Sequence, residues 1–394
     1  MTGARLAVML CLSSVLLGCR GSCRQSIPSP ATDSSVLYES TGELSPAHVP
    51  HDTSEVLVWE WMPDLHEGDG TGRQKEGGGE LRLLELSLER GSRNILWRAP
   101  APFCPTRSNT DVHTDLRVVH VGNDVDSDSG NPRSAAFVWD ASTPHKPSVQ
   151  LSRWVEGLGA KPRWGPQGDA VCYILKGLGD SGPEGTLRLV ALPVPRPAIR
   201  TDGQVISSKE SNVRDFAWSP EGHQLYVSGY SQQKQYIDIV QYPGLAAKQF
   251  ILPGAAFQLT VAQDTGDVIF AVQPPRENGR DDQSEVTDIW RLSPGSRPRP
   301  AISIPRKSLH AMSVSPDGTL IAVIPRAGEG PRETGVGVSV FSLADGTSHG
   351  LPEFEGRTAA SADWVLGGRG LLILDGSRAW LVDTASVLRR GEGE

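Results

Sequence analysis

Short apolar stretches joined by compact polar turns make up most of this chain. In DFAWSPEGHQLYVSGY, Asp215–Tyr230, an apolar stretch ends at Trp218, a Ser-Pro-Glu-Gly step follows, and a second apolar stretch leaves it. Proline presets φ for the first central position of a type I turn, and glycine accepts the left-handed conformation that follows. The pattern therefore predicts two strands joined as a tight β-hairpin with a bulge.

The same hairpin pattern recurs at 161–175, 258–272, 311–325 and 361–375. The apolar residue before each turn gives one anchor per copy, in the order Trp164, Trp218, Val261, Val314 and Trp364. These anchors are 54, 43, 53 and 50 residues apart. A period of about 50 residues built from short strands is typical of a β-propeller.

A second pair of apolar segments follows each hairpin, so each repeat supplies four strands. Two further units, 56–98 and 114–152, raise the number of repeats to seven. The predicted fold is all-β, a β-propeller of four-stranded antiparallel blades, with seven blades and with six as the alternative. The stretch SSVLYES, Ser34–Ser40, is expected to complete the last blade, which would close the ring and remove open sheet edges.

The Ser-Pro-Asp/Glu-Gly hairpins after Trp218 and Val314 resemble the repeats of the TolB family of β-propellers. In architecture the resemblance covers Val56 to the end of the sequence, and it is specific only at these turns. The N-terminal α/β domain of that family has no counterpart in this sequence. The family's partners are therefore not carried over.

The first residues resemble the leader of a bacterial lipoprotein. Arg5 precedes an apolar run, Leu6–Leu17, that is too short to span a bilayer and is typical of a signal peptide. Leu16-Leu17-Gly18-Cys19 resembles a lipobox, which implies cleavage before Cys19 and lipidation of Cys19; a plain secretory signal is the alternative. Arg20 after the cysteine implies, by resemblance to enterobacterial sorting, the outer membrane, facing the periplasm or the cell surface.

Three segments follow from these patterns. Residues 1–18 are predicted to be a signal peptide, 19–49 a flexible tether rich in Ser, Pro and Thr, and 50–394 a single propeller domain. Cys172 lies in an apolar strand pattern and is expected to be a buried thiol. The sequence leaves open whether Cys23 and Cys104 form a disulfide, since nothing in their spacing favours the bond.

The net charge of −8 argues against a nucleic-acid binder, which needs clustered Lys and Arg. Most of this charge falls in the predicted connections between second and third strands, which would emerge on one face. Such a face would attract a basic protein, although polar loops are also expected on any propeller. The connections are 63–79, 123–133, 177–185, 229–235, 274–285 and 326–335.

One of these loops, NDVDSDSGNPR, carries alternating carboxylates at Asp124, Asp126 and Asp128, a spacing that can serve Ca²⁺. Gly130 comes one place late for an EF-hand loop, and position twelve is Ala135 rather than Glu. The loop is therefore an incomplete candidate calcium site. No other cofactor is expected.

No catalytic motif stands out: the sequence has no Gly-x-Ser-x-Gly elbow, phosphate-binding loop or His-Glu-x-x-His. The expectation is a monomeric, non-catalytic module, anchored in the bacterial envelope by lipid, that binds envelope proteins, basic ones among them. The alternative is a propeller-based hydrolase or lyase that acts on an envelope glycan or peptide. Its signature would be carboxylates or histidines that converge at the mouth of the channel.

Overall fold

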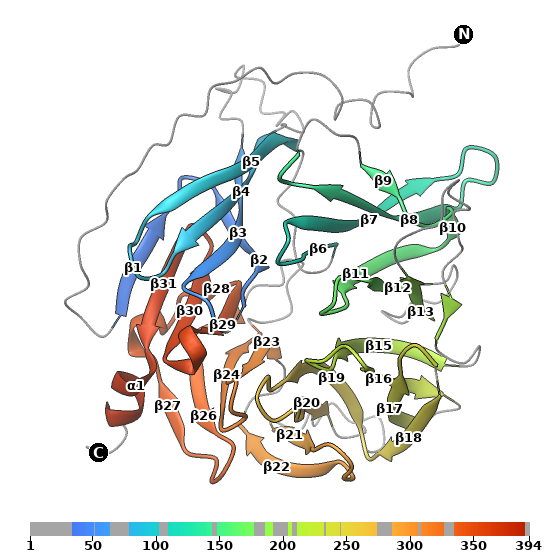
Figure 1. Cartoon of the computed structure of the whole chain (residues 1–394). Helices are drawn as coiled ribbons and strands as arrows, with labels where there is room; N and C mark the ends of the chain where they lie inside the picture. Colours follow the sequence, from blue (N-terminus) through green and yellow to red (C-terminus); the bar gives the residue numbers. More distant parts are fainter. Residues whose placement is uncertain are drawn as a thin grey trace, which may run out of the picture.

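Seven small antiparallel sheets form a ring around a central opening (Figure 1). The prediction of a seven-bladed β-propeller is confirmed. The computed structural model describes residues 34–50, 52–63, 79–101, 109–143, 148–176, 186–191, 204–206, 211–231, 234–244, 246–273, 286–305, 309–326 and 335–390.

Each blade has four strand positions, numbered outward from the opening. The inner strands are β2 (Glu43–His48), β6 (Thr110–Val112), β11 (Leu158–Trp164), β15 (Ser211–Trp218), β19 (Ala255–Val261), β23 (Leu309–Val314) and β29 (Ser361–Val365). The second strands are β3 (Glu55–Pro63), β7 (Arg117–Val125), β12 (Ala170–Lys176), β16 (Gln224–Ser231), β20 (Val268–Gln273), β24 (Leu320–Pro325) and β30 (Gly370–Asp375).

The third strands are β4 (Gly79–Ser87), β8 (Pro132–Asp140), β13 (Thr186–Ala191), β17 (Lys234–Gln241), β21 (Thr287–Leu292), β26 (Ser339–Ser342) and β31 (Arg378–Asp383). The outer strands are β5 (Arg93–Ala101), the pair β9 (Val149–Gln150) and β10 (Val155–Glu156), β14 (Gln204–Val205), β18 (Ala247–Leu252), β22 (Arg299–Ile304), β27 (Ser348–Gly350) and β1 (Ser34–Glu39). We number the blades 1 to 7 in the order of their inner strands.

Few elements lie outside the blades. A two-stranded sheet joins β25 (Gly335–Val336) to β28 (Thr358–Ala359), and two short 3-10 helices, η1 (Pro352–Phe354) and η2 (Leu366–Gly368), lie nearby in the chain. Helix α1 (Thr384–Arg390) follows the last strand. Its Val387 is buried in the apolar layer between blades 6 and 7, so this helix is attached to the ring.

The N-terminal strand closes the ring. Strand β1 pairs antiparallel with β31, as predicted for Ser34–Ser40, and Arg378 bonds Glu39 at 2.8 Å. The predicted boundary between tether and propeller at residue 50 is wrong, because both β1 and β2 lie inside the range 19–49. Strand β2 is short and polar, and pairing with β3, rather than local hydrophobicity, makes it a strand.

The predicted hairpin chemistry is present in the turns that join inner and second strands. The Gly222 amide donates to the Ser219 carbonyl at 2.9 Å, and Gly318 makes the same bond to Ser315. Both glycines have φ above +70°, which other residues rarely adopt. In blade 6 the Ser315 hydroxyl also donates to Asp317 at 2.6 Å, which fixes the turn.

The core is a ring of seven apolar layers, one between each pair of adjacent blades. The anchor Trp364 is fully buried between blades 6 and 7. Trp59, Trp97 and Trp139 meet between blades 1 and 2 with ring centroids 4.5–6.2 Å apart. Each large side chain buried in this way stabilises the fold by about 1.5–3 kcal/mol, so the tryptophans belong to blade packing.

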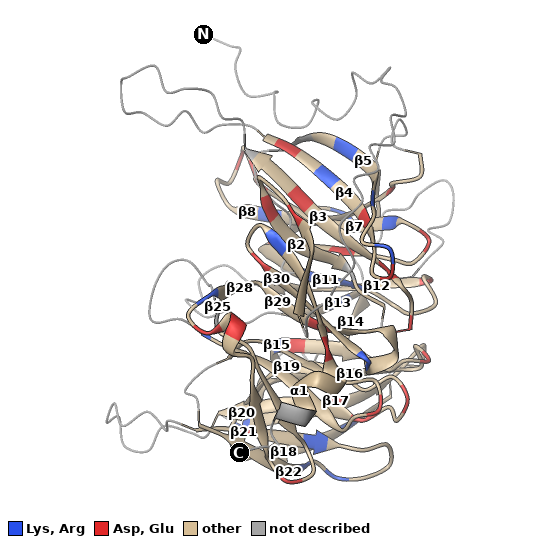
Figure 2. Cartoon of the chain, turned by 90° about the vertical axis from the view of Figure 1, so that its left-hand side faces the viewer, with Lys and Arg blue, Asp and Glu red and all other residues tan. Residues whose placement is uncertain are grey.

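Turns that join the same two strand positions in each blade lie on the same face of the ring. The turns between inner and second strands lie on the face seen in Figure 1, which Figure 2 shows edge-on at the right. We call it the hairpin face. The connections between second and third strands lie on the opposite face, because successive antiparallel turns alternate between the two ends of a sheet.

Candidate binding face and channel

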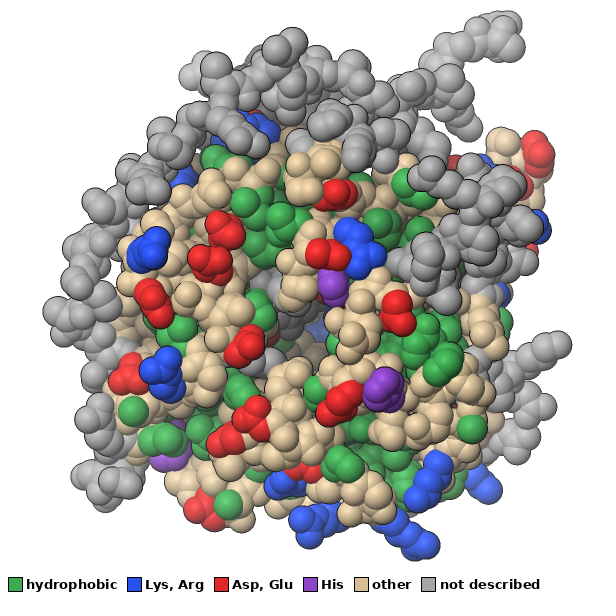
Figure 3. All heavy atoms as spheres, viewed as in Figure 1, with side chains coloured by type: hydrophobic (Ala, Val, Ile, Leu, Met, Phe, Trp, Pro, Cys, Tyr) green, Lys and Arg blue, Asp and Glu red, His purple; other side chains and the backbone are tan. Residues whose placement is uncertain are grey.

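Six of the seven turns on the hairpin face carry an exposed acidic residue, and the seventh carries Arg369. Figure 3 shows acidic side chains distributed around the hollowed opening at the centre of this face. Because the turns occupy equivalent places in successive blades, the ring places these carboxylates around the mouth of the channel. We call this set the carboxylate ring: Asp52, Asp115, Asp169, Glu221, Asp264 and Asp317.

Local contacts keep two members of the ring ionised. Partial burial opposes ionisation of Asp115, but hydrogen bonds from His113 and Arg117 outweigh it and lower the pKa of the carboxyl. The same balance holds at Asp317, where Ser315 and Thr319 bond the carboxylate and lower its pKa. These side chains are therefore negatively charged at neutral pH.

His113 lies at the junction of blades 2 and 3. Its Nδ1 lies 2.9 Å from Asp115 and its Nε2 lies 3.3 Å from the Pro166 carbonyl oxygen of the next hairpin. The Arg117 guanidinium bonds the same carboxylate at 2.7 Å and stacks over the buried Trp164 ring. This group brings an imidazole and a carboxylate together at the mouth of the channel.

Side chains cover the inner edges of the blades. An inner strand has no neighbour on its channel side, so its backbone groups need other partners. Asp111 accepts from the Trp164 amide at 2.8 Å, and Asp215 accepts from the Leu259 amide at 3.0 Å. The Trp364 indole donates to the Ser313 carbonyl at 2.9 Å. Each bond joins neighbouring blades, which couples adjacent inner strands.

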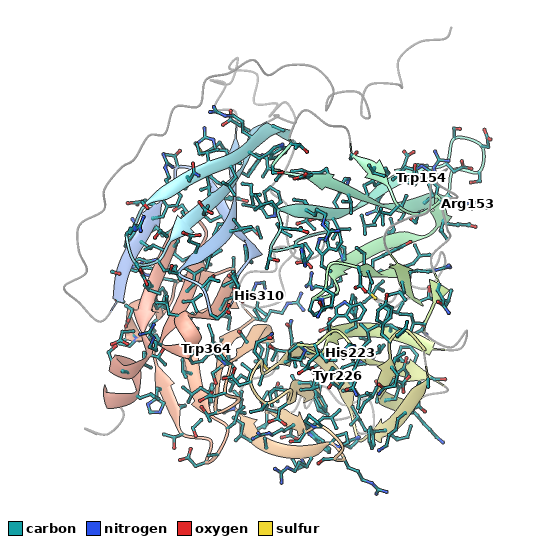
Figure 4. The ribbon with its side chains drawn as sticks, in the orientation of Figure 1. Arg153, Trp154, His223, Tyr226, His310 and Trp364 are labelled. Carbon is teal, nitrogen blue, oxygen red and sulfur yellow. The ribbon has the colours of Figure 1, made fainter. Side chains whose placement is uncertain are left out.

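The inner strands of blades 3 to 6 have a β-bulge or register shift at a similar depth. Bulges leave extra residues unpaired and re-aim their side chains. In these four blades the bulges include residues with hydrogen-bond donors, and Figure 4 shows one of them, His310, beside the central opening. We call this set the channel arc: Lys161, Arg214, Gln258 and His310.

Direct contacts link the members of the channel arc. Lys161 Nζ donates to the Arg214 carbonyl and to Asp215, both at 3.1 Å, and Gln258 Nε2 donates to the His310 carbonyl at 2.9 Å. Lys161 and Gln258 have φ of 52° and 54°, which is strained for residues other than glycine and costs about 1–2 kcal/mol each. The fold thus stabilises an unfavourable backbone at these two bulges of the inner strands.

The predicted calcium candidates lie together at the end of β7 and in the turn that follows it, but two of them bind a cation of the protein itself. Arg133 bonds Asp124 at 3.0 Å and Asp126 at 2.9 Å, while Asp128 lies beside Ser127. Among the described residues no group of three or more His, Cys, Asp or Glu is arranged to hold a metal. The calcium assignment stays a prediction.

Several predicted features fall outside the described residues. They include the lipidation site Cys19, the pair Cys23 and Cys104, and most of the acidic connections between second and third strands. Cys172 is described, and it is a fully buried thiol, as expected, whose pKa is raised by that burial. No helix in the described part of the chain is long and apolar enough to cross a membrane.

Sequence reasoning missed the carboxylate ring and the channel arc. The ring could have been found by aligning the turns of all repeats, since six of the seven turns have an acidic residue near the tip. The arc gives no such signal, because bulges depend on strand pairing, and Lys161 and His310 stand in ordinary strand sequence.

No protein-family model matches the chain, and no curated protein matches its sequence. Among solved structures, the β-propeller domain of Myceliophteria thermophila Cps50 (Swd1) aligns with a TM-score of 0.51 at 11% identity, over 89% of this chain and 99% of that one. An oligogalacturonate lyase in complex with manganese covers 93% of this chain and 98% of its own, at 13% identity and a TM-score of 0.41.

The β-propeller domain of the Trilobed protease from Pyrococcus furiosus aligns over 68% of this chain and 77% of that chain, with 12% identity and a TM-score of 0.45. At such identities the likeness concerns architecture alone. The first of these comparisons and the seven sheets agree that this chain is a β-propeller.

Proposed function

We propose that this protein is a non-catalytic binding module that engages a basic protein partner through the carboxylate ring. The observation that carries the proposal is the repetition of an exposed carboxylate in six hairpins around one channel mouth. Rigid blades hold these charges at fixed places, so a basic polypeptide meets all of them at once. Such a field favours encounter with cations and repels nucleic acid and anionic lipid.

A charge-neutralised variant tests the proposal. The variant Asp169→Asn, Glu221→Gln, Asp264→Asn removes three carboxylates of the ring; a matched control, Asp128→Asn, Glu156→Gln, Glu355→Gln, removes three exposed carboxylates outside these turns. Exposed ion pairs contribute about 0.5 kcal/mol each, so a hexalysine peptide should bind the ring variant about tenfold more weakly at low salt. Equal weakening in both variants would contradict the proposal.

We further propose that the protein is a lipoprotein of the bacterial outer membrane, facing the periplasm or the cell surface, and acts there as a monomer. The support is the leader sequence, with its short apolar run and the lipobox-like step ending at Cys19. A Cys19→Ala variant should lose incorporation of labelled palmitate and leave the membrane fraction. Normal membrane association of that variant would overturn the anchor.

Capture of partners with the lipidated wild-type protein from detergent-solubilised envelopes identifies the ligand class. We expect a protein whose isolated binding region is basic and whose capture decreases with salt, because exposed charges are screened over about 10 Å at 0.1 M. Capture that is insensitive to salt would place the binding site elsewhere than the carboxylate ring.

The contact between His113 and Asp115 favours a second candidate, an envelope hydrolase or lyase. An imidazole oriented by a carboxylate at a channel mouth is the arrangement of a general base. Its Nε2, however, lies against the Pro166 carbonyl oxygen rather than in the open channel. Turnover of envelope glycan or peptide fragments by the wild type that is lost in His113→Ala would favour this candidate over the binding module.

A further inference from the structure

We propose that the free edge of β18 (Ala247–Leu252), the outer strand of blade 4, binds an extended acidic segment of a partner protein as an added strand (Figure 1). We call this surface the β18 edge. The inference goes beyond the proposed function, because the β18 edge lies on the outside of the ring and includes no residue of the carboxylate ring. The regularity of the strand, the direction of its backbone groups and the charges beside it support this ligand.

The β18 edge is the least protected of the seven outer edges. Native proteins shorten, bend or charge their edge strands, because an unpaired edge recruits other chains. The outer strands of blades 2, 3 and 6 are two or three residues long, and those of blades 1, 5 and 7 have a register shift. By contrast, β18 has six residues, no proline and a regular register along β17. It is the one long and regular outer edge in the described part of the chain.

Every second residue of β18 directs its backbone groups away from the sheet. The Gln241 amide donates to the Ala246 carbonyl at 2.8 Å, which makes this a hydrogen-bonded pair of the ladder with β17. Bonded and non-bonded pairs alternate along an antiparallel ladder, so the outward N–H and C=O groups follow from this pair. They belong to Ala247, Gln249 and Ile251. No other strand among the described residues pairs with them, and an added strand would bond them, as in other cases of strand addition.

The side chains of the β18 edge also suit an added strand. Ile251 is 58% exposed although it is large and apolar, and the neighbouring Phe250 is half-buried. Side chains that lie opposite each other on adjacent antiparallel strands are about 4.5–5.5 Å apart. An apolar residue of an added strand would therefore cover Ile251 and remove apolar surface from water.

The charges beside the β18 edge favour an acidic ligand. Lys248 of β18 is exposed, as are Arg297 and Arg299 of the neighbouring blade 5, and none of the three forms an ion pair with another described residue. The two outer turns here, 241–247 and 293–298, contain no Asp or Glu. Figure 3 shows basic side chains along the lower rim of the hairpin face, over these blades. An acidic residue of the ligand beside the start of β18 would meet this positive charge.

Charge and strand direction define the occupant. A second copy of this chain would bring another β18 edge, whose sequence AKQFIL has no acidic residue, so charge complementarity favours a different protein. Antiparallel pairing is the more stable arrangement, and it places the C-terminal end of the ligand beside Lys248. The ligand is therefore an extended segment with apolar residues at alternate positions and acidic residues at its C-terminal end.

Two peptides of the same composition test the inference on the whole protein. The first is Thr-Val-Thr-Val-Thr-Glu-Glu, and the second has the reverse order; each has a neutral N-terminal fluorophore and a C-terminal amide. Fluorescence anisotropy should show that the first peptide binds about fivefold more tightly, because only its acidic end meets the cations in an antiparallel strand.

A charge placed on the β18 edge should block the first peptide. Ile251→Lys should weaken its binding about tenfold or more, since an edge lysine opposes strand addition. The matched control is Val149→Lys, at a residue that is 57% exposed on the outer strand β9, and it should bind like the wild type. Both substituted side chains are exposed, so both variants should keep the wild-type Tm.

Methylation of the peptide backbone distinguishes strand addition from other binding. Alternate amides of an added strand face β18, and the others face away. N-methyl groups on residues 2, 4 and 6 or on residues 3, 5 and 7 of the first peptide should therefore differ: one set abolishes binding, and the other changes the affinity by less than about threefold. Equal effects of the two sets would show that the peptide does not bind as a strand.

The outcomes are separate from those for the carboxylate ring. The ring variant should bind the first peptide within about twofold of the wild type, and Ile251→Lys should still bind hexalysine normally. The inference is wrong if the first peptide does not bind, or if its binding survives in Ile251→Lys. It is also wrong if light scattering shows a wild-type dimer that Ile251→Lys converts to a monomer, since a second copy then occupies the edge.

Discussion

Asp238, on β17, is ionisable but stands in apolar surroundings. By strand alternation it shares a face with Val240, which packs against blade 3, and its Oδ1 has no hydrogen-bond partner among the described residues. Burial raises the pKa of this carboxyl to about 6, and a bond from Gln249 only partly opposes the rise. At neutral pH the fold therefore contains a charge that burial disfavours.

Asp238→Asn should stabilise the protein at neutral pH. The folded pKa exceeds the ordinary value of 3.8, so ionisation costs stability as pH rises from about 4 through 6, and the cost vanishes below both values. Because the side chain is partly exposed, we expect a gain of about 1 kcal/mol at pH 7.5 and almost none at about pH 3. Urea unfolding at the two pH values measures it, and equal effects at both would contradict the assignment.

Arg133 decides the chemistry of the acidic loop between β7 and β8. Its guanidinium bonds both Asp124 and Asp126, so a calcium ion would have to displace it. We expect that about 5 mM CaCl₂ changes the Tm of the wild type by less than about 1 °C. Calcium stabilises the folded protein only if it binds the carboxylates more strongly than Arg133 does. A rise of several degrees that Asp124→Asn abolishes would instead establish a calcium site.

At the scale of elements, the closure of the ring depends on a buried polar cluster around Glu60, which is 1% exposed. Ser40 donates to Glu60 at 2.5 Å, Arg82 pairs with it at 3.1 Å, and Tyr38 of β1 donates to it. Arg93 in turn donates to the Tyr38 hydroxyl. The cluster joins the N-terminal strand of blade 7 to β3, β4 and β5 of blade 1, in addition to the short chain connection from β1 to β2.

Tyr38→Phe tests this closure. Burial, followed by the contact with Glu60, raises the pKa of Tyr38 to about 12, so the hydroxyl keeps its proton and donates it at neutral pH. Its removal leaves a buried carboxylate short of one partner, which should cost about 1–3 kcal/mol. Hydrogen exchange should become faster in β1 and β31 first. Tyr242→Phe, in the turn between β17 and β18, serves as the control.

At the scale of the molecule, each blade packs only against its two neighbours. The ring is complete because blade 7 packs against blade 1. The layer between blades 7 and 1 contains Leu37 and Tyr38 of β1 together with Val56 and Val58 of β3. A propeller open at this place would expose one apolar layer and the edge of β31. Closure is therefore a property of the whole ring that no single blade supplies.

A chain that begins at Gly42 lacks β1 and should show the consequence. We expect its Tm to fall by about 10 °C or more and its unpaired β31 edge to promote self-association, as uncovered strand edges do. A chain that begins at Ser34 keeps β1 and should melt like the mature protein. Thermal melts and light scattering measure both effects; an unchanged Tm without β1 would show that blade 7 is stable with three strands.

The repeats could be read from the sequence because they depend on local chemistry. Trp218 before Ser-Pro-Glu-Gly predicts a strand, a turn and a second strand from proline φ, glycine freedom and apolar pattern alone. Spacing of the anchors then predicts the propeller, and the structure confirms seven blades. The strand at Ser34 was also predictable, because a ring of blades needs one more outer strand at its closure.

The sites could not be read in the same way. Glu60 looks like an exposed residue of an alternating strand, and only the strand brought from the N-terminus buries it. Lys161 and Arg214 lie 53 residues apart, and the bulges in which they stand arise from pairing with the second strands. A short polar strand such as β2 is likewise held by its pairing with β3 rather than by an apolar pattern of its own.

The sequence by itself thus determined the unit and its number, because turn residues and apolar alternation act within a few positions of the chain. Only the tertiary structure decided which charged and polar side chains the units bring together. Closing the ring turns six separate hairpin carboxylates into one acidic mouth and brings donors from four blades to one depth of the channel. Those charges act on a ligand jointly, since electrostatic interactions depend on distance in space rather than on separation along the chain.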